Sequence, residues 1–343
     1  MFKKALVFLM IPVLLACVSS ALAGGASVIV SLGDSYSSGE GIEPFYGQEA
    51  DMAARCQDPD WLGHRSEKSW PGALTLPAVD GPMRDHRGEN WFFAAVSGAS
   101  APDLFLLSEE ETAAGMTAVQ ERKYSRDGVS GVGRIPPQLD VFDELDAKGL
   151  RADYVTVTIG GNDIGFQAIL SLSMFGGLSF YPGETPEEKA AALLQDRYAA
   201  PGVRAKIKRV YTDIAKRAGS QACIIAAGYP PLLDPEGASR NGFTEDAARI
   251  LNAASVLLNA EIRDIVEECR SEGINICFVS VAEEFEGHGA YAEDPYLFPV
   301  YFGARAQDLR SVMPASSYSM HPNEKGAAVY ARCVQQLINE RER

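Results

Sequence analysis

The chain is organised around Val28-Ile29-Val30-Ser31-Leu32-Gly33-Asp34-Ser35-Tyr36-Ser37-Ser38-Gly39, an apolar run that ends in small polar residues. A short β-branched run cut off by Gly-Asp-Ser predicts a buried strand followed by a tight turn. Ser35 then lies at the carboxyl end of that strand, which is where open α/β sheets bind their ligands. A hydroxyl on such a turn suits a nucleophile, although Gly-Asp-Ser is also common in turns that have no catalytic role.

Four further β-prone runs alternate with helical patterns along the chain. The runs cover residues 91–96, 154–159, 222–227 and 274–281, and helices are expected over 138–148, 203–218, 244–272 and 324–339. Strands that alternate with helices indicate a mostly parallel sheet that is covered on both faces. We therefore expect an α/β fold with a five-stranded, mostly parallel sheet. The apolar stripe from Ile250 to Val266 is expected in the core rather than on a lipid-binding face.

Two long segments between these elements are less regular. Residues 40–90 are polar and contain glycine and proline, and residues 166–200 carry Gly176-Gly177 and Pro182-Gly183. Loops of this length usually carry function or small elements of their own. Because the sequence shows no repeat and no low-complexity linker, we expect a single domain over residues 24–343 with insertions near 40–90 and 166–200.

The first 23 residues are typical of a signal peptide. Lys3 and Lys4 precede an apolar run over 5–18 that is too short to span a bilayer, and Ala21-Leu22-Ala23 offers a small-x-small cleavage site. We expect export, to the medium or the periplasm, after cleavage at Ala23. The alternative is a lipoprotein box at Leu14-Leu15-Ala16-Cys17, with Cys17 acylated, but Leu15 is unusual at that position.

The formal charge of −15 over 343 residues argues against partners of negative charge. We expect no nucleic-acid partner and no docking on an anionic membrane by charge. No later apolar run is long enough for an integral membrane span, and we expect a monomer.

Removal of the leader leaves five cysteines, so at least one of them has no partner within the chain. Oxidising conditions favour a disulfide, and Cys269 with Cys277 or Cys223 with Cys277 are both acceptable pairs on strand and helix placement. Cys56 and Cys333 complete the set. The sequence has no Cys-x-x-Cys and no histidine cluster, so we expect no metal site.

Small polar motifs follow three of the five expected strands. They are Gly33-Asp34-Ser35, Ser97-Gly98 and Gly160-Gly161-Asn162-Asp163, and a parallel sheet brings them to one edge. His321-Pro322, just before the last helix, can return to that edge. Acyl transfer at an ester needs a hydroxyl, a base and donors for the oxyanion. Ser35 as nucleophile, His321 as base, and the N–H groups of Ser35 and Gly98 with the Asn162 amide as oxyanion hole fill these roles.

These motifs resemble those of the SGNH (GDSL) hydrolase family. The four marker residues of that family match Ser35, Gly98, Asn162 and His321 in the same order, and the resemblance covers essentially the whole mature chain. The run at 33–41, Gly228-Tyr229-Pro230 and the Phe-x-Gly-His motif at 285–288 are similar, more narrowly, to secreted actinobacterial-type esterases and phospholipases. The resemblance implies a flavodoxin-like three-layer α/β/α sandwich. It also implies hydrolysis of carboxylic esters through an acyl-serine intermediate, with no cofactor.

One position departs from the family pattern. Many members carry an aspartate three residues before the histidine, where this chain has Tyr318. In the subfamily a backbone carbonyl near that position orients the imidazole, so the resemblance implies a Ser35–His321 dyad with the Tyr318 carbonyl accepting from Nδ1–H. A carbonyl stabilises imidazolium less than a carboxylate does. Asp308, or another distant acid, is the alternative.

Several further aromatic side chains are candidates for the wall of a substrate pocket. His288 is a candidate for the lining of the pocket, and an exposed loop position is the alternative reading. Trp61, Trp70 and Phe166 are candidates for an acyl pocket, with core packing as the default.

The sequence therefore predicts a secreted serine ester hydrolase of the carboxylesterase type that acts on a small-molecule or lipid ester. A lipase or phospholipase A acting on aggregated lipid is the alternative within the enzyme class. A non-catalytic cell-wall or carbohydrate-binding module is the alternative from another class, and the intact set of four marker residues argues against it.

Overall fold

A computed structural model describes residues 27–104, 108, 119, 132–174, 176–198, 202–302 and 316–343. The expected leader over residues 1–23, with Cys17, lies outside the described residues, and so does Asp308. Within the described ranges, the helices are too short or too polar to cross a membrane.

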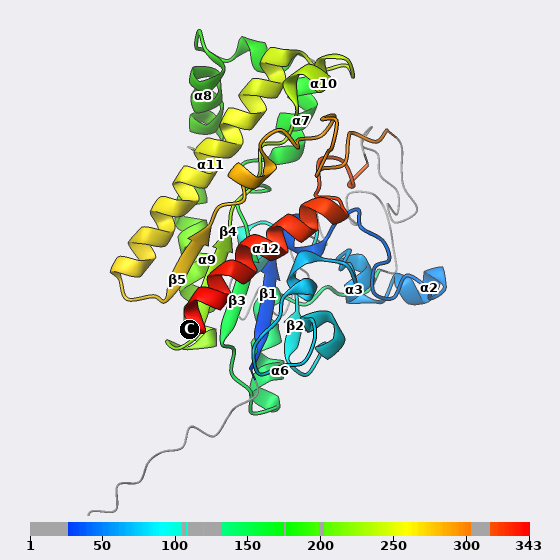
Figure 1. Cartoon of the computed structure of the whole chain (residues 1–343), viewed down its shortest axis with the longest axis vertical. Helices are drawn as coiled ribbons and strands as arrows, with labels where there is room; N and C mark the ends of the chain where they lie inside the picture. The colour runs from blue at the N-terminus through cyan, green and yellow to red at the C-terminus, as the bar shows by residue number, and fades with distance from the viewer. Residues whose placement is uncertain are drawn as a thin grey trace, which may run out of the picture.

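A parallel sheet of five strands forms the centre of the molecule, in the order β2-β1-β3-β4-β5 (Figure 1). The strands are β1 (Ile29–Gly33), β2 (Trp91–Phe93), β3 (Tyr154–Thr158), β4 (Cys223–Ala227) and β5 (Ile276–Val279). β1 and β3 pair in continuous register from Ile29 opposite Tyr154 to Gly33 opposite Thr158. Their side chains are buried on both faces, as expected for the centre of a parallel sheet. The expected α/β fold and the five-stranded parallel sheet are thus confirmed.

Helices cover both faces of the sheet. In Figure 1 α12 crosses the front of the sheet, whereas α9 lies behind β4 and packs against α11. α7, α8 and α10 gather with one end of α11 beyond the carboxyl ends of the strands (Figure 1). The helices are α1 (Ser35–Ser38), α2 (Met52–Arg55), α3 (Pro59–Leu62), α6 (Val141–Ala147), α7 (Phe166–Met174), α8 (Pro186–Tyr198), α9 (Val203–Ala218), α10 (Pro235–Ser239), α11 (Glu245–Ser271) and α12 (Glu324–Arg341).

The long helix α11 begins and ends close to its expected bounds because its sequence carries local signals. Thr244 caps the helix, and its side chain accepts a hydrogen bond from the Ala247 N–H at 3.0 Å. Apolar residues then recur at helical spacing, and Ile250, Leu258 and Ile262 are buried.

Strand β2 is shorter than the run over 91–96 from which it was predicted. The Arg65 guanidinium, itself buried, donates to the carbonyls of Ala95 at 2.8 Å and Ala94 at 3.1 Å. These carbonyls are therefore satisfied by a side chain instead of another strand, and the ladder ends at Phe93. A long-range contact of this kind leaves no trace in the local sequence pattern.

The five cysteines of the described residues are all free thiols, so neither of the two expected pairs is a disulfide in this structure. Cys269 lies buried on α11, while the Cys277 thiol contacts the thiol of Cys223 on the neighbouring strand. The Arg341 guanidinium lies 3.0 Å from the Cys277 sulfur. Of the two cysteine pairs considered from the sequence, Cys223 and Cys277 are therefore the pair whose thiols are in contact.

Candidate active site

Ser35 and His321 meet at the carboxyl end of β1. Ser35 is the first residue of α1, directly after the strand, and Asp34 caps this short helix by accepting from the Tyr36 N–H at 3.0 Å. The Nε2 atom of His321 lies 2.7 Å from the Ser35 hydroxyl oxygen, although 286 positions separate the two residues. Both side chains are largely buried, with 7% and 8% of their surfaces exposed. A serine–base hydrogen bond is the arrangement that activates a serine nucleophile.

Backbone hydrogen bonds hold the segment that carries His321. The His321 carbonyl accepts from the Phe298 N–H at 2.8 Å, and the His321 N–H donates to the Tyr318 carbonyl at 3.3 Å. Asn323 then caps α12 by accepting from the N–H groups of Lys325 and Gly326. The Tyr318 carbonyl thus lies in a tight turn with the base, and its expected bond to Nδ1–H stays a prediction.

Glycine is required at the end of β1. Gly33 has a φ of +122°, and a Cβ atom there would lie 2.4 Å from the Thr158 carbonyl oxygen of the neighbouring strand. The Gln138 side chain holds Gly33 from the other side, since its amide accepts from the Gly33 N–H at 2.7 Å and donates to the Gly33 carbonyl at 2.8 Å. These contacts fix the turn on which Ser35 is carried.

The two other expected oxyanion residues come from neighbouring loops that are joined to each other. Gly98 has a φ of +84° in the turn after β2. The Asn162 side-chain amide donates to the Ala99 carbonyl at 2.8 Å, and the Asp163 carboxylate accepts from the Ala101 N–H at 3.0 Å. Because an asparagine amide carries two N–H donors, the bond to Ala99 leaves one Asn162 hydrogen for a ligand. Asp163 thus braces the two loops.

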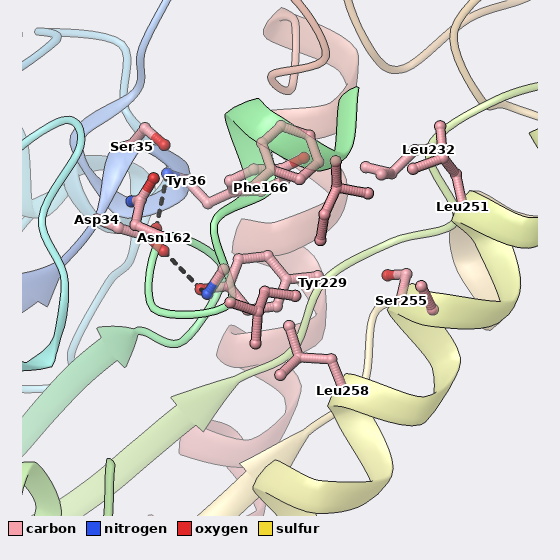
Figure 2. A pocket seen from close by; sticks show the side chains of 14 residues that line it. Asp34, Ser35, Tyr36, Asn162, Phe166, Tyr229, Leu232, Leu251, Ser255 and Leu258 are labelled. Atoms are coloured by element: carbon pink, nitrogen blue, oxygen red, sulfur yellow. Dashed lines mark hydrogen bonds between the residues drawn. The ribbon is translucent and has the colours of Figure 1, made fainter. Parts of the chain in front are cut away.

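A buried hydrogen-bond network lies under the site. The Asp34 carboxylate accepts from the Tyr229 hydroxyl (Figure 2) and from the Thr158 hydroxyl at 2.7 Å. The Tyr229 hydroxyl in turn accepts from the Gly161 N–H at 3.1 Å. Burial raises the pKa of Asp34 to about 6, since its three donors only partly offset the loss of water. Burial raises the pKa of Tyr229 as well, so its hydroxyl stays protonated. Through this chain, Asp34 connects the turn of Ser35 to the loop of Asn162.

No role was predicted for Tyr229, because the Gly228-Tyr229-Pro230 motif contributed only to a family resemblance. A signal was present, because Tyr229 follows the expected strand over 222–227 and therefore had to lie at the same sheet edge as Ser35. Its partner, Asp34, lies 195 positions away. That distance hides the contact from any local pattern.

An apolar cavity begins beside Ser35 and Asn162 (Figure 2). It runs between α7 and α11 and is closed by aliphatic and aromatic side chains. The apolar and aromatic residues in its wall are Tyr36, Ile164, Phe166, Ile169, Tyr229, Leu232, Leu251, Ala254 and Leu258. Part of the α11 stripe that was predicted as core therefore faces the cavity.

The aromatic candidates divide between cavity and core. Phe166 lines the cavity, whereas Trp61 and Trp70 are fully buried in the core. His288 stacks on Tyr296 with a ring-centroid distance of 3.8 Å, and its Nδ1 lies 2.7 Å from the Asp294 carbonyl oxygen. His288 is thus held by its own loop and is not among the residues that line the cavity beside Ser35.

A metal site would need several histidine, cysteine or acidic side chains close together in the part of the chain that the structure describes. No group of three or more histidine, cysteine, aspartate or glutamate side chains there is arranged to hold a metal ion.

Two curated lipases are similar to this chain over most of its length. No family model matches the chain. The chain is 26% identical over 275 residues to a lipase from Streptomyces rimosus, which covers 80% of this chain and 77% of that protein. It is 27% identical over 307 residues to Lipase 2 from Streptomyces coelicolor, which covers 87% of this chain and 81% of the relative.

Two solved structures share the fold. The phospholipase A1 from Streptomyces albidoflavus NA297 superposes with a TM-score of 0.55 at 19% identity, over 92% of this chain and 99% of that one. The extracellular lipase from Streptomyces rimosus superposes with a TM-score of 0.54 at 22% identity, over the same shares of the two chains.

Proposed function

We propose that this chain belongs to the SGNH (GDSL) hydrolase family and is a secreted serine ester hydrolase in which Ser35 is the nucleophile and His321 the general base. Two lipase relatives and the shared fold of two solved structures support this assignment. One observation carries the proposal, namely the 2.7 Å contact between His321 Nε2 and the Ser35 hydroxyl beside an apolar cavity.

The reaction follows from the positions of these groups. His321 takes the hydroxyl proton of Ser35 while the serine oxygen attacks the ester carbonyl carbon. The N–H groups of Ser35 and Gly98 and the remaining amide hydrogen of Asn162 donate to the oxyanion of the tetrahedral intermediate. The imidazolium then protonates the departing alkoxide and leaves an acyl-serine. His321 next removes a proton from water, which attacks the acyl group, and the imidazolium returns that proton to the Ser35 oxygen as the carboxylic acid leaves.

The Tyr318 carbonyl is our candidate for the group that orients the imidazole. It already belongs to the turn of His321, where it accepts the backbone N–H of that residue. The Tyr318 side chain is turned away from this task, because its hydroxyl donates to the Glu43 carboxylate at 2.8 Å. A backbone carbonyl that accepts from Nδ1–H would fix the tautomer and the orientation of the His321 imidazole without adding a full charge.

The cavity supports an acyl ester of moderate length as the substrate. Its wall is almost entirely apolar, and its mouth holds the nucleophile and Asn162. An acyl chain of several carbons would bury its surface there while the alcohol part points outward. The named activities of the relatives, lipase and phospholipase A1, fit the same geometry and keep a lipase or phospholipase as the second candidate. A binding module without turnover would not need the Ser35–His321 contact.

Export through the leader over residues 1–23 and a monomeric domain over 24–343 complete the proposal. Lipoprotein anchoring through Cys17 is its alternative. The apolar, lysine-led start of the chain supports secretion, and the S. rimosus structure is described as an extracellular lipase.

Hydrolysis of a series of p-nitrophenyl esters from acetate to palmitate tests the function. Ser35→Ala and His321→Ala should each abolish turnover, because both act on the reacting atoms. Ser38→Ala is the matched control on the same short helix, since its hydroxyl makes only a 3.4 Å contact with the Ser35 carbonyl. Full activity in Ser35→Ala would refute the proposal.

The chain-length preference tests the role of the cavity. Ala254 lies in the wall on α11, and Ala254→Phe should shift the preference to shorter acyl esters by filling the cavity. Ala260→Phe, at an exposed position of the same helix, should leave the preference unchanged. An unchanged profile in Ala254→Phe would place the acyl chain elsewhere.

A further inference from the structure

The residue before the base has an unusual backbone conformation. Met320 has a φ of +64°, in the left-handed region that a side chain with a Cβ seldom adopts, and it is fully buried. Its N–H donates to the Phe298 carbonyl at 3.1 Å. Because the peptide of Met320 leads directly into His321, a change in this conformation would swing the imidazole away from Ser35.

A side chain next to the nucleophile holds this conformation. The Tyr36 hydroxyl donates to the Met320 carbonyl at 2.7 Å, and Tyr36 is 5% exposed. The Tyr36 ring lies 5.2 Å from the His321 imidazole and 5.1 Å from the Tyr229 ring, edge-on to the latter. The Tyr36 carbonyl accepts from the Trp70 indole N–H at 2.9 Å, which fixes the backbone from which the ring projects.

Two further contacts join the same parts of the chain. We call residues 35–43 the nucleophile segment and residues 316–321 the histidine segment. The Ser317 hydroxyl donates to the buried Glu40 carboxylate at 2.9 Å, and the other oxygen of Glu40 lies 2.7 Å from His64 Nδ1. The Tyr318 hydroxyl also donates to Glu43, so these contacts hold the first residues of the histidine segment against the nucleophile segment. Tyr36 bonds the end of the histidine segment, at Met320.

We propose that Tyr36 is a positioning residue for the ester hydrolysis described above, which holds Met320 left-handed and thereby keeps His321 Nε2 on the Ser35 hydroxyl. Tyr36 acts through the Met320 carbonyl and touches no reacting atom. The nucleophile segment thus carries both the attacking serine and the group that sets the position of its base. This inference rests on the proposed function.

Tyr36→Phe removes only the hydroxyl, and Tyr330→Phe is its matched control. Tyr330 is also fully buried and also donates to a backbone carbonyl, that of Gly228 at 2.7 Å. Its ring meets the Tyr36 ring edge-on at a centroid distance of 6.3 Å, but its hydroxyl bonds to Gly228, which lies outside both segments. Active sites are titrated with a p-nitrophenyl phosphonate, and the turnover of p-nitrophenyl butyrate is measured per titrated site. A purely structural role would lower the number of titrated sites and leave turnover per site unchanged.

We expect Tyr36→Phe to titrate fully and to lose about tenfold in kcat per site with KM within twofold, because misplacing a general base forfeits part of its roughly hundredfold or greater effect. Tyr330→Phe should stay within twofold of the native enzyme. Unchanged kcat per site in Tyr36→Phe would overturn the proposal. If the native chain shows neither turnover nor titration, the proposed function fails on its own.

A double-mutant cycle with Met320→Gly tests the left-handed conformation itself. Glycine adopts positive φ freely, so in the Met320→Gly background the loss caused by Tyr36→Phe should shrink to less than about threefold. An undiminished tenfold loss would overturn this role. A crystal structure of Tyr36→Phe decides the point without any activity. We expect Met320 to leave the left-handed region, and an unchanged contact between His321 and Ser35 would contradict the proposal.

Discussion

The protein should lose free energy of unfolding as the pH rises from mildly acidic to neutral. Replacing Asp34 by asparagine should abolish much of that loss. Asp34 is 1% exposed and accepts hydrogen bonds from the Tyr36 N–H, the Thr158 hydroxyl and the Tyr229 hydroxyl. Burial nevertheless dominates and raises the pKa of Asp34 from 3.8 to about 6. The folded protein therefore binds this proton more tightly than the unfolded chain does.

The sign and size of the effect follow from linkage. A carboxyl whose folded pKa lies above its unfolded pKa contributes stability below the unfolded value, and that contribution is lost as the pH rises through the folded pKa. One pKa unit is worth ~1.4 kcal/mol, so the rise from 3.8 to about 6 corresponds to about 3 kcal/mol in total. Between about pH 4 and about pH 7.5, Asp34 should remove about 2 to 3 kcal/mol from the free energy of unfolding.

Urea unfolding of the native chain and of Asp34→Asn at these two pH values measures the difference. Asparagine does not titrate, so the native chain should lose about 2 to 3 kcal/mol more than the variant over this range. Asparagine also causes a pH-independent loss of about 1 kcal/mol, because it gives up one hydrogen-bond acceptor. This loss cancels when the change in free energy of unfolding between the two pH values is compared for the two proteins. Asp163, whose pKa burial also raises to about 6, is present in both proteins. An equal change in the free energy of unfolding in the two proteins would refute the reasoning.

Three other predictions follow from single contacts. Asn162→Ala should lower kcat/KM for p-nitrophenyl butyrate by about a hundredfold or more, because it removes an oxyanion donor; a change below threefold would take Asn162 out of the oxyanion hole. Tyr318→Phe should keep activity within twofold and lose about 1 kcal/mol in urea unfolding, since its bond to Glu43 is lost; inactivity would contradict the carbonyl role. Hydrogen bonding from the neighbouring thiol and the Arg341 guanidinium lower the pKa of Cys277, so iodoacetamide at mildly acidic pH should alkylate Cys277 first. Arg341→Leu should slow that reaction, and equal rates in the two proteins would exclude the guanidinium as the cause.

The sheet could be predicted because its determinants are local. A β-branched run such as Val28–Val30 is buried on both faces wherever it lies in a parallel sheet, and Gly-Asp-Ser marks its end. The parallel arrangement then places every strand end, including that before Ser35, at one edge, and His321 reaches this edge from the segment before α12. The structure brings the two side chains into hydrogen-bond contact, 286 positions apart.

The details that hold the site could not be predicted in the same way. The Tyr36 bond to the Met320 carbonyl and the Tyr229 bond to Asp34 join side chains whose partners lie far along the chain. Hydrophobic periodicity reports burial and says nothing about which buried hydroxyl meets which carbonyl. The cavity wall on α11 illustrates the same limit, since Leu258 belongs to an apolar stripe that reads as core whether it meets another helix or an open cavity.

Covalent trapping tests the central claim most directly. The native chain is mixed with p-nitrophenyl butyrate, quenched in acid within the first turnover, digested and examined by mass spectrometry. We predict one butyryl group per molecule, on the peptide that contains Ser35, and none in Ser35→Ala. Butyrylation of a different residue, or continued release of p-nitrophenol by Ser35→Ala, would contradict the account.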